Sequence, residues 1–595
     1  MLSLAQVVRR LLSLFPLIAM LTLLCVACSP WAQAQSADRV LGTINPNART
    51  TVPGHPPSWA SSQNDTGAMP ADITLDHLTL ILARSPEMQQ AFEQFLASQQ
   101  DPGSADYHQW LTPIEVGERF GVSLHDIAAV SDWLRSQGLH VDSTSSSRDR
   151  ITFSGSASAV GNAFGAEMHY FKVNGKQHIS ITSEPRIPAA LAPVIKAIHG
   201  LYTIEHRPMH KMSVVQFPLH GATPDLTGSS GKHYVAPADF ATIYDLNSVY
   251  NGGVTGTGQT IAIIGRARVY NPDIENFQSL SGLATKDPTV TVPPNGVDPG
   301  PPASSGSAPD DQGEATLDVT RSGSIATGAT INLVISKSTN TADGIDIATE
   351  YAVDTTPVPA HIMSISFGAC EFNAGQVGVT FWDSLFSQGA AEGISTFVSS
   401  GDSGAAGCDD HNQPPPATQI LSPNYICSSS YATCVGGTEF ADTANPSQYW
   451  SPSNGPGLKS ALSYIPEGAW NDPLNGNSTE LASSGGGVST VIPTPSWQTG
   501  TGVPAARAGR YTPDVAFSAS GHDGYFGCLA ADGGSCVMQS GGGFSFEFFS
   551  GTSAATPDMA GIAALLNQKE GGPQGNLNPT LYKLAATVSN VFHDV

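Results

Sequence analysis

Positively charged residues are scarce in this chain of 595 residues. Lysine and arginine total 26 against 50 aspartates and glutamates, so the formal net charge is −24. This charge argues against nucleic acids and anionic membranes as partners, because both are negatively charged. Charged residues make up only 13% of the chain. A sparse, mostly acidic surface loses much of its charge at low pH, which suits a protein that works in acid.

Long apolar runs are missing after the N-terminus, so no later segment is long enough to span a bilayer. At the N-terminus, two arginines precede an apolar run over 11–27, and Ala32-Gln33-Ala34 offers a cleavage site of the A-x-A type. We therefore predict a signal peptide over 1–34, export of the chain and no stable membrane anchor. There are two alternatives. The same run could form a membrane anchor, or the chain could be a lipoprotein with its lipid on Cys28.

Cysteine is also infrequent, and two of the eight cysteines lie in the signal region. The rest of the chain has no C-x-x-C pair, which argues against a zinc site. The six remaining cysteines are an even set in an exported chain and predict disulfides, with fifteen connectivities open. Pairing of near neighbours favours two local loops and leaves one longer pair. These pairs are Cys427–Cys434, Cys528–Cys536 and Cys370–Cys408.

Glycine and proline are abundant, with 61 and 43 residues, and indicate a loop-rich α/β or β-containing protein. The length predicts two or three domains. Residues 35–70 are rich in Pro, Ser, Asn and Thr and predict a flexible lead. A small domain follows over 71–205. Residues 206–232 lose periodicity and predict a linker with a proteolytic processing site, and a large domain covers 233–595.

Both domains mix strands and helices. In the small domain, strand-like runs and helical spacings alternate, which predicts a small α+β fold that is ferredoxin-like. In the large domain, apolar strands alternate with helix-like stretches, which predicts an α/β fold with a parallel sheet and right-handed crossovers. Its expected strands cover 260–265, 330–335, 361–367 and 394–399, and its expected helices cover 341–353 and 376–391.

A small-residue turn delivers Ser553 to the start of an almost wholly apolar helix, within the string Phe549-Ser-Gly-Thr-Ser-Ala-Ala-Thr-Pro557. The amide-rich end of a buried helix favours a nucleophile whose product is an oxyanion. Pro557 fits the first turn of this helix, where its missing N–H costs nothing. A plain helix cap is the simpler interpretation of Ser553.

A serine nucleophile needs a base. No histidine of the large domain lies in a small-residue, Gly-rich setting that suits a base. Glu314 and Asp318 are four residues apart, so a helix places both carboxyls on one face. Such a pair shares a proton and acts at low pH, where histidine is protonated. A solvated helix face is the alternative. The histidines considered are His233, His361, His411, His522 and His593.

Asp402 follows an apolar strand in the turn Ser399–Gly404, and loops at the ends of parallel strands carry active sites. An ionised Asp402 would repel a developing oxyanion, whereas a protonated one donates a hydrogen bond to it. The alternative is an ordinary turn aspartate that caps its own loop.

In their order along the chain, Glu314-x-x-x-Asp318, Ser-Gly-Asp402 and Gly-Thr-Ser553 resemble the motifs of the sedolisin family of acid-acting serine-carboxyl peptidases. The segment Asp106–Pro113, with Arg119-Phe120-Gly121, resembles the activation propeptide of that family. The resemblance implies a subtilisin-like catalytic domain and a propeptide that inhibits it. It also implies that Ser553 is the nucleophile, Glu314 the general base and acid, Asp318 its orienter and Asp402 the oxyanion stabiliser. Substrate would contact Ser366, Phe367 and Gly368 on a strand and Ser484, Gly485 and Gly486 in a cleft loop.

The chain also departs from the family pattern. Gly265 and Phe367 stand where some members extend the carboxylate chain with a glutamate and a tryptophan. Asp594 and Val595 resemble the start of the family's calcium site, but the Gly-rich loop that supplies the other ligands does not follow. Calcium takes six to eight oxygen ligands, so the expected Ca²⁺ site is incomplete in this chain.

The prediction from sequence is a secreted or periplasmic, monomeric, acid-acting serine-carboxyl endopeptidase, made as a self-processing zymogen. Its partners are peptide or protein substrates and its own propeptide. A histidine-dependent subtilisin-like peptidase is one alternative. A catalytically silent secreted binding module of the same fold is the other.

Overall fold

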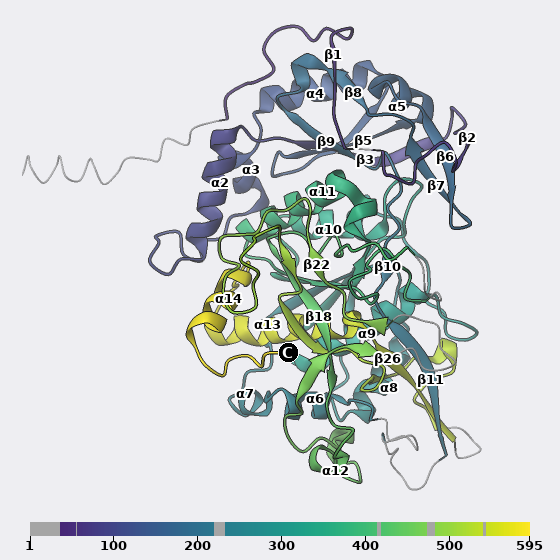
Figure 1. Ribbon diagram of the computed structural model, residues 1–595, viewed down its shortest axis with the longest axis vertical. Helices are drawn as coiled ribbons and strands as arrows, with labels where there is room; N and C mark the ends of the chain where they lie inside the picture. The colour runs from purple at the N-terminus through teal and green to yellow at the C-terminus, as the bar shows by residue number, and fades with distance from the viewer. Residues whose placement is uncertain are drawn as a thin grey trace, which may run out of the picture.

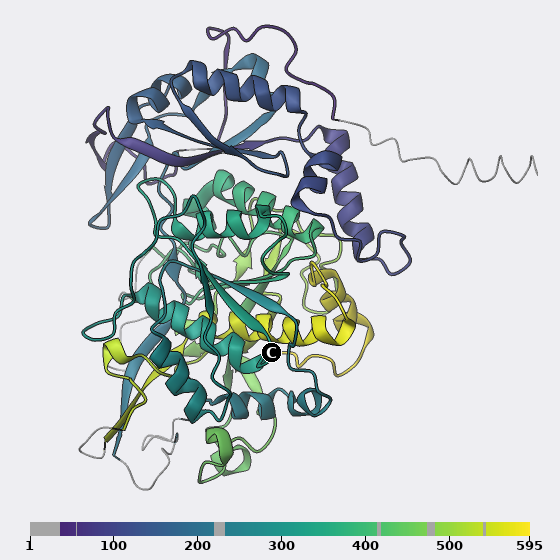
Figure 2. The same ribbon diagram turned by 180° about the vertical axis from the view of Figure 1, so that it is seen from behind.

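The computed structural model describes residues 36–54, 56–218, 226, 233–412, 418–472, 482–538 and 543–595. The predicted signal peptide lies outside these residues. An N-terminal domain sits on one side of a larger C-terminal domain (Figures 1 and 2). Within the described ranges, no helix has the length and apolar character needed to cross a membrane.

The N-terminal domain is an α+β unit around an antiparallel sheet with the strand order β4-β5-β3-β9. Serine or threonine side chains cap the N-termini of its four helices, which begin where the sequence turns from extended to helical spacing. Apolar side chains of the sheet and of α4 and α5 form one core. The sheet strands are β3 (Thr74–Leu82), β4 (His140–Thr144), β5 (Arg150–Ser156) and β9 (Ile195–His199). The helices are α2 (Pro86–Gln99), α3 (Pro113–Phe120), α4 (Leu124–Ser136) and α5 (Ala157–Phe164).

The predicted flexible lead over 35–70 is wrong for the residues described. They form β1 (Arg49–Thr51), which pairs with β8 (Arg186–Pro188), and β2 (Asp65–Ala68), which pairs with β6 (Met168–Val173); β6 in turn pairs with β7 (Lys176–Ile181). Val40, Val52 and Met69 are buried in the domain core. Isolated apolar residues in a polar stretch have no periodicity, so the sequence pattern did not reveal these contacts.

The C-terminal domain is built on a largely parallel sheet with the order β13-β14-β12-β15-β17-β18-β19, and β24 also pairs with β18. All its pairings are parallel except that of β19. The expected α/β architecture is therefore present, and the four predicted strands lie within a few residues of the observed ones. The strands are β12 (Thr260–Gly265), β13 (Thr289–Thr291), β14 (Thr330–Ile335), β15 (Ile362–Ile365), β17 (Ser395–Ser399), β18 (Ala432–Phe440), β19 (Glu467–Ala469) and β24 (Val515–Ser518).

Helices cover both faces of this sheet, as the alternation of its side chains requires. Ile261 and Ile263 of β12 pack toward the helices α9 and α13, whereas Ala262 and Ile264 pack toward α10 and α11. Helix α13 runs through the middle of the domain (Figure 1). The helices are α6 (Pro237–Ile243), α7 (Asn247–Asn251), α8 (Asn271–Leu280), α9 (Asp310–Ile325), α10 (Gly344–Asp354), α11 (Glu371–Ala391), α12 (Pro446–Tyr449), α13 (Thr552–Glu570) and α14 (Asn578–Thr587).

The two domains meet where α10 and α11 face the N-terminal sheet (Figure 2). His199 of β9 stacks on Phe381 with 4.1 Å between ring centroids, and its Nε2 lies 3.0 Å from Asp346 Oδ2. Arg150 of β5 donates to Gln388 Oε1 at 2.6 Å. The N-terminal domain thus covers the outer helices of the C-terminal domain through buried polar contacts.

All six cysteines outside the signal region are described, and they pair as expected from proximity along the chain. The disulfides are Cys370–Cys408, Cys427–Cys434 and Cys528–Cys536.

The predicted linker over 206–232 contains two strands in its described part. Its described residues include β10 (Arg207–Pro208) and β11 (Lys211–Pro218). Strand β11 pairs with β26 (Gly543–Ser550), which also pairs with β25 (Tyr525–Gly527). β11 and β26 form a long arm that projects from the domain (Figures 1 and 2). Residues 219–225 and 227–232 lie outside the described part of the chain.

Candidate active site

Helix α9 carries both predicted carboxyl residues into the interior. Glu314 and Asp318 are each 1% exposed, so the alternative of a solvated helix face is wrong. The helix is buried along most of its length because it packs against both the sheet and α13. The face of α9 that carries Glu314 and Asp318 therefore points into the interior, where a carboxyl group needs hydrogen-bond partners.

Ser553 is the second residue of α13, after Gly551 in the N-cap position. Gly551 has φ of 111°, a backbone conformation that L side chains rarely adopt. The Ser553 hydroxyl lies 2.9 Å from Glu314 Oε2 and 3.1 Å from the carbonyl oxygen of Ser366. Pro557 lies inside the helix rather than in its first turn, which corrects that expectation. The helix begins at Thr552, earlier than its apolar run indicates.

The substrate-strand residue Ser366 connects to the carboxyl pair. It lies between β15 and β16 (Phe367–Gly368), and its hydroxyl donates to Asp318 Oδ1 at 2.8 Å. Sequence reasoning placed Ser366 at the substrate but did not anticipate this contact. Ser553, Glu314, Asp318 and Ser366 therefore form one buried polar cluster.

Burial raises the pKa of both carboxyls well above their ordinary values. A hydrogen bond between the Glu314 and Asp318 side chains also affects both pKa values, and the negative charge of Glu314 raises the pKa of Asp318 further. Glu314 Oε1 and Asp318 Oδ2 are both buried and accept no hydrogen bond from any described N–H or O–H group. Two carboxyls hydrogen-bond each other only when one carries a proton, so such a bond favours a form in which the pair shares one proton.

Asp402 lies in the loop that follows β17 and reaches the start of α13. Its Oδ1 accepts hydrogen bonds from the Thr552 backbone N–H at 2.9 Å and from the Thr552 hydroxyl at 2.8 Å. Its Oδ2 is buried without a hydrogen-bond partner. Burial raises the pKa of Asp402 to about 7. In acid, Asp402 is therefore protonated and has a hydrogen to donate from Oδ2.

The loop Ser484–Gly486 packs against the loop that carries Asp402. The backbone N–H of Gly485 donates to the carbonyl of Gly401 at 2.6 Å, and a β-carbon on Gly485 would lie 2.3 Å from the carbonyl oxygen of Ser400. This close approach requires glycine. The contacts place the loop as a support for Asp402; its predicted contact with substrate stays a prediction.

A segment of the chain itself occupies the site. Strand β10 pairs antiparallel with β16, so that Arg207 faces Gly368 and Pro208 faces Phe367. The Met209 N–H donates to the carbonyl of Ser366 at 3.1 Å, and the Met209 carbonyl accepts from the Ser553 N–H at 2.8 Å. The strand predicted to bind substrate therefore pairs with the linker.

Two histidines enter this region. His210 Nδ1 lies 2.6 Å from Glu314 Oε2, the oxygen that also contacts Ser553. His411 Nε2 lies 3.3 Å from the carbonyl oxygen of His210, and burial lowers the pKa of His411 to about 4. Sequence reasoning placed His210 in a linker and His411 in a structural loop. Neither residue lies in a periodic element, so no local pattern indicated its position.

The predicted calcium ligands do not fit a calcium site. Asp594 and Val595 are both exposed, and Asp594 belongs to no cluster of metal-ligating side chains among the residues described. One such cluster occurs elsewhere, where Asp442, His522 and Asp523 bring ligand atoms within 4.8 Å of one another. It also has internal partners, since His522 Nε2 lies 2.8 Å from Asp442 Oδ1.

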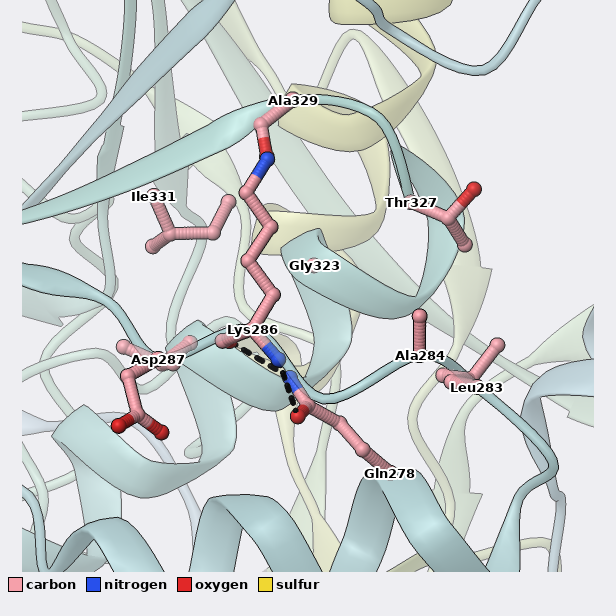
Figure 3. Close-up of a pocket in the computed structure, with 10 residues that line it drawn as sticks. Gln278, Leu283, Ala284, Lys286, Asp287, Gly323, Thr327, Ala329 and Ile331 are labelled. Carbon is pink, nitrogen blue, oxygen red and sulfur yellow. Dashed lines mark hydrogen bonds between the residues drawn. The ribbon is translucent and has the colours of Figure 1, made fainter.

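Two cavities lie away from this site, and the larger, of about 620 Å³, is lined by Asp76, His77 and Glu350 among others. The smaller, of about 40 Å³, lies between α8 and α9 (Figure 3). The Lys286 side chain crosses it to donate to the carbonyls of Gly328 and Ala329 at 3.2 and 2.5 Å, while the Lys286 backbone and the Gln278 amide bond each other. The lysine is thus fully engaged in joining two segments of the domain.

Comparison with known proteins agrees with this architecture. The family model "Pro-kumamolisin, activation domain" matches residues 62–204, and the model "Subtilase family" matches residues 306–587. Kumamolisin from Bacillus sp. (strain MN-32) is 30% identical over 482 residues, which cover 80% of this chain and 77% of that protein. Sedolisin from Pseudomonas sp. (strain 101) is 27% identical over 526 residues, covering 87% and 81%.

A solved structure of Pseudomonas sedolisin is described as a serine-carboxyl proteinase complexed with two molecules of pseudo-iodotyrostatin. It is 26% identical to this chain, covers 61% of it and 88% of the sedolisin chain, and has a TM-score of 0.48. The two family models identify the N-terminal domain as an activation domain of the pro-kumamolisin type and the C-terminal domain as a subtilisin-like peptidase domain. The chain is a serine-type peptidase zymogen that belongs to the sedolisin family of serine-carboxyl peptidases.

Proposed function

We propose that this protein is an exported, acid-acting endopeptidase that processes itself and hydrolyses peptide bonds through a serine acyl-enzyme. The observation that carries the proposal is the buried contact of 2.9 Å between the Ser553 hydroxyl and Glu314 Oε2. It gives the nucleophile a carboxyl partner in the place where a histidine-dependent enzyme needs an imidazole. The negative net charge and the three disulfides support a role outside the cell.

In the first step, the Ser553 oxygen attacks the substrate carbonyl and its proton passes to Glu314 Oε2. Glu314 Oε1 transfers a proton to Asp318. The negative charge of the carboxyl pair is thus shared between two hydrogen-bonded groups, and no isolated buried carboxylate forms. Glu314 then protonates the leaving amine. In the second step, water attacks the ester carbonyl and gives a proton to Glu314. Glu314 then returns a proton to the Ser553 oxygen as the ester bond breaks. Asp318 orients Glu314 and is itself held by the Ser366 hydroxyl.

The oxyanion of each tetrahedral intermediate is stabilised by two donors. One is the backbone N–H of Ser553 at the start of α13, where the helix dipole adds to its effect. The other is the proton on Asp402 Oδ2. Thr552 occupies Asp402 Oδ1 with two hydrogen bonds, so the free oxygen is the one that carries the proton.

The proposal is tested by acid incubation of the purified precursor. At about pH 3–5, where carboxyl pKa values lie, we expect cleavage between the two domains, followed by hydrolysis of an added denatured protein. A precursor held well above pH 7, where Asp402 is ionised, is the control and stays intact. A precursor that binds peptides but stays intact in acid would instead favour the catalytically silent binding module.

Asp402 is expected to set the alkaline limit of activity. Its pKa of about 7 means that kcat falls as pH rises through about 7, since the ionised carboxylate repels the oxyanion instead of donating to it. In Asp402→Asn the amide keeps a donor at every pH, so this decline moves upward or vanishes. The measurement is kcat against pH for a peptide substrate.

The matched variant is Asp402→Ala, which lacks a donor and loses about 10²–10³-fold in kcat at all pH values. An alkaline decline that is identical in the wild type and in Asp402→Asn would remove Asp402 from the oxyanion site.

A further inference from the structure

We propose that the first bond the zymogen cuts is its own Met209–His210 peptide bond. This inference rests on the proposed function and specifies the substrate that the site already holds. The segment over residues 206–210, here named the cleft segment, lies in the site in the manner of a substrate. Four independent contacts determine which of its peptide bonds faces Ser553.

The first contact is the strand pairing upstream of the bond. Arg207 and Pro208 pair antiparallel with Gly368 and Phe367, and the Met209 N–H continues this ladder to the carbonyl of Ser366. An extended peptide added to a strand in this manner presents its next carbonyl at a defined position. That next carbonyl belongs to Met209.

The second contact places this carbonyl in the oxyanion site. The Met209 oxygen accepts from the Ser553 N–H at 2.8 Å. Both this oxygen and Asp402 Oδ2 lie 2.5 Å from the point where a β-carbon on Gly551 would sit. The oxygen therefore lies beside the two groups expected to stabilise the oxyanion, which identifies Met209 as the residue whose carbonyl carbon is attacked.

The third contact places the side chain of the residue that supplies the leaving amine against the proton donor. His210 Cα lies 2.8 Å from the same Gly551 position, and His210 Nδ1 lies 2.6 Å from Glu314 Oε2. Glu314 is thus within reach of both the attacking hydroxyl and the residue that supplies the leaving amine. This arrangement meets the requirement for a single group that acts first as base and then as acid.

The fourth contact prevents the segment from sliding. Upstream, His206 Nδ1 lies 3.0 Å from Asp343 Oδ2, and His206 Nε2 contacts the Tyr425 hydroxyl. Downstream, Lys211 faces Ser550 at the start of the β11–β26 ladder. A slip by one residue would break both anchors and turn every side chain of the segment to the opposite face. The register therefore selects one bond.

The chemistry balances with groups already present. The Ser553 oxygen forms a bond to the Met209 carbonyl carbon, and the bond from that carbon to the His210 nitrogen breaks. The serine proton reaches the His210 nitrogen through Glu314. Water then hydrolyses the Met209 ester, which frees the Met209 carboxyl group and restores Ser553. The N-terminal fragment ends at Met209, and the peptidase fragment begins at His210 and keeps β11.

The test is the identity of the first products of acid processing in the wild-type precursor. Samples taken early are analysed by N-terminal sequencing of the large fragment and intact mass of the small one. We expect a large fragment that begins His210-Lys211-Met212 and a small fragment that ends at Met209. A Ser553-dependent first cut at any other bond would overturn this inference and leave the proposed function intact. An absence of Ser553-dependent cutting would instead count against the proposed function.

A second measurement does not depend on folding of a variant. The matured enzyme is given a synthetic peptide that covers residues 203–214 and a matched peptide with His210→Pro. We expect cleavage of the first after Met209, and at least about a hundredfold slower cleavage of the second, because proline replaces the leaving N–H and restricts the backbone. Cleavage after Met212 in both peptides, with none after Met209, would contradict the assigned bond.

Discussion

Ser553→Ala is expected to abolish acid processing of the precursor, with a loss of about 10⁶-fold in the rate constant of self-cleavage. The reason is that the Ser553 oxygen forms the covalent bond, and no other hydroxyl of the described residues contacts Glu314. The backbone N–H of residue 553 and Asp402 would still polarise the carbonyl of Met209, so a small residual rate above that of the uncatalysed reaction is compatible with the mechanism. The measurement is the fraction of intact precursor over time at about pH 4.

The matched control is Ser463→Ala, which removes the hydroxyl of an exposed loop serine and is expected to process at the wild-type rate. Equal thermal melting of the two variants and the wild type shows that the fold is unchanged. Processing of Ser553→Ala at more than about one hundredth of the wild-type rate would mean that another group is the nucleophile.

Glu314→Gln is expected to slow processing by about 10²–10⁴-fold. Glutamine has the same shape and still accepts a hydrogen bond from Ser553, but it cannot take up the serine proton or return it to the leaving amine. Removing the negative charge beside Asp318 also relieves one cause of the raised pKa of Asp318. We therefore expect the remaining activity to lose the pH dependence that the carboxyl pair gives the wild type. Rates are measured from about pH 3 to 7.

The matched control is Glu570→Gln, which changes an exposed glutamate at the end of α13 and leaves the rate unchanged. Glu314→Asp tests position rather than chemistry, since it keeps a carboxyl but shortens its reach; it is expected to recover part of the activity. If Glu314→Gln retains the wild-type rate, a different group accepts the serine proton, and the histidine-dependent alternative is favoured.

The local patterns of the sequence predicted much of the framework. The apolar runs at 260–265 and 330–335 coincide with β12 and β14, because a strand buried on both faces has a continuous apolar sequence. The spacing of Glu314 and Asp318 predicted one helix face, and α9 places them there. Spacing cannot distinguish an internal face from a solvated one, since that depends on which element packs against the helix.

The cleft segment shows what local patterns cannot reveal. Met209 and His210 lie in a stretch without periodicity, and their environment comes from residues more than one hundred positions away: Glu314, Ser366 and Ser553. The same holds for Val40 and Val52, whose burial requires the N-terminal sheet. In both cases a contact between distant segments supplies the stabilising energy, and the segment's own composition gives no sign of it.

The sequence by itself determined the order of the domains, the alternation that makes the parallel sheet, the nucleophile motif at Ser553 and the helical spacing of the carboxyl pair. These features depend on residues close together in the chain. Backbone geometry and the period of buried positions govern interactions at that range. Only the tertiary structure decided that both carboxyls are buried, that Asp402 faces the start of α13 and that the Met209 carbonyl lies against Ser553. These depend on packing between segments far apart in sequence, because desolvation and hydrogen-bond geometry act on neighbours in space.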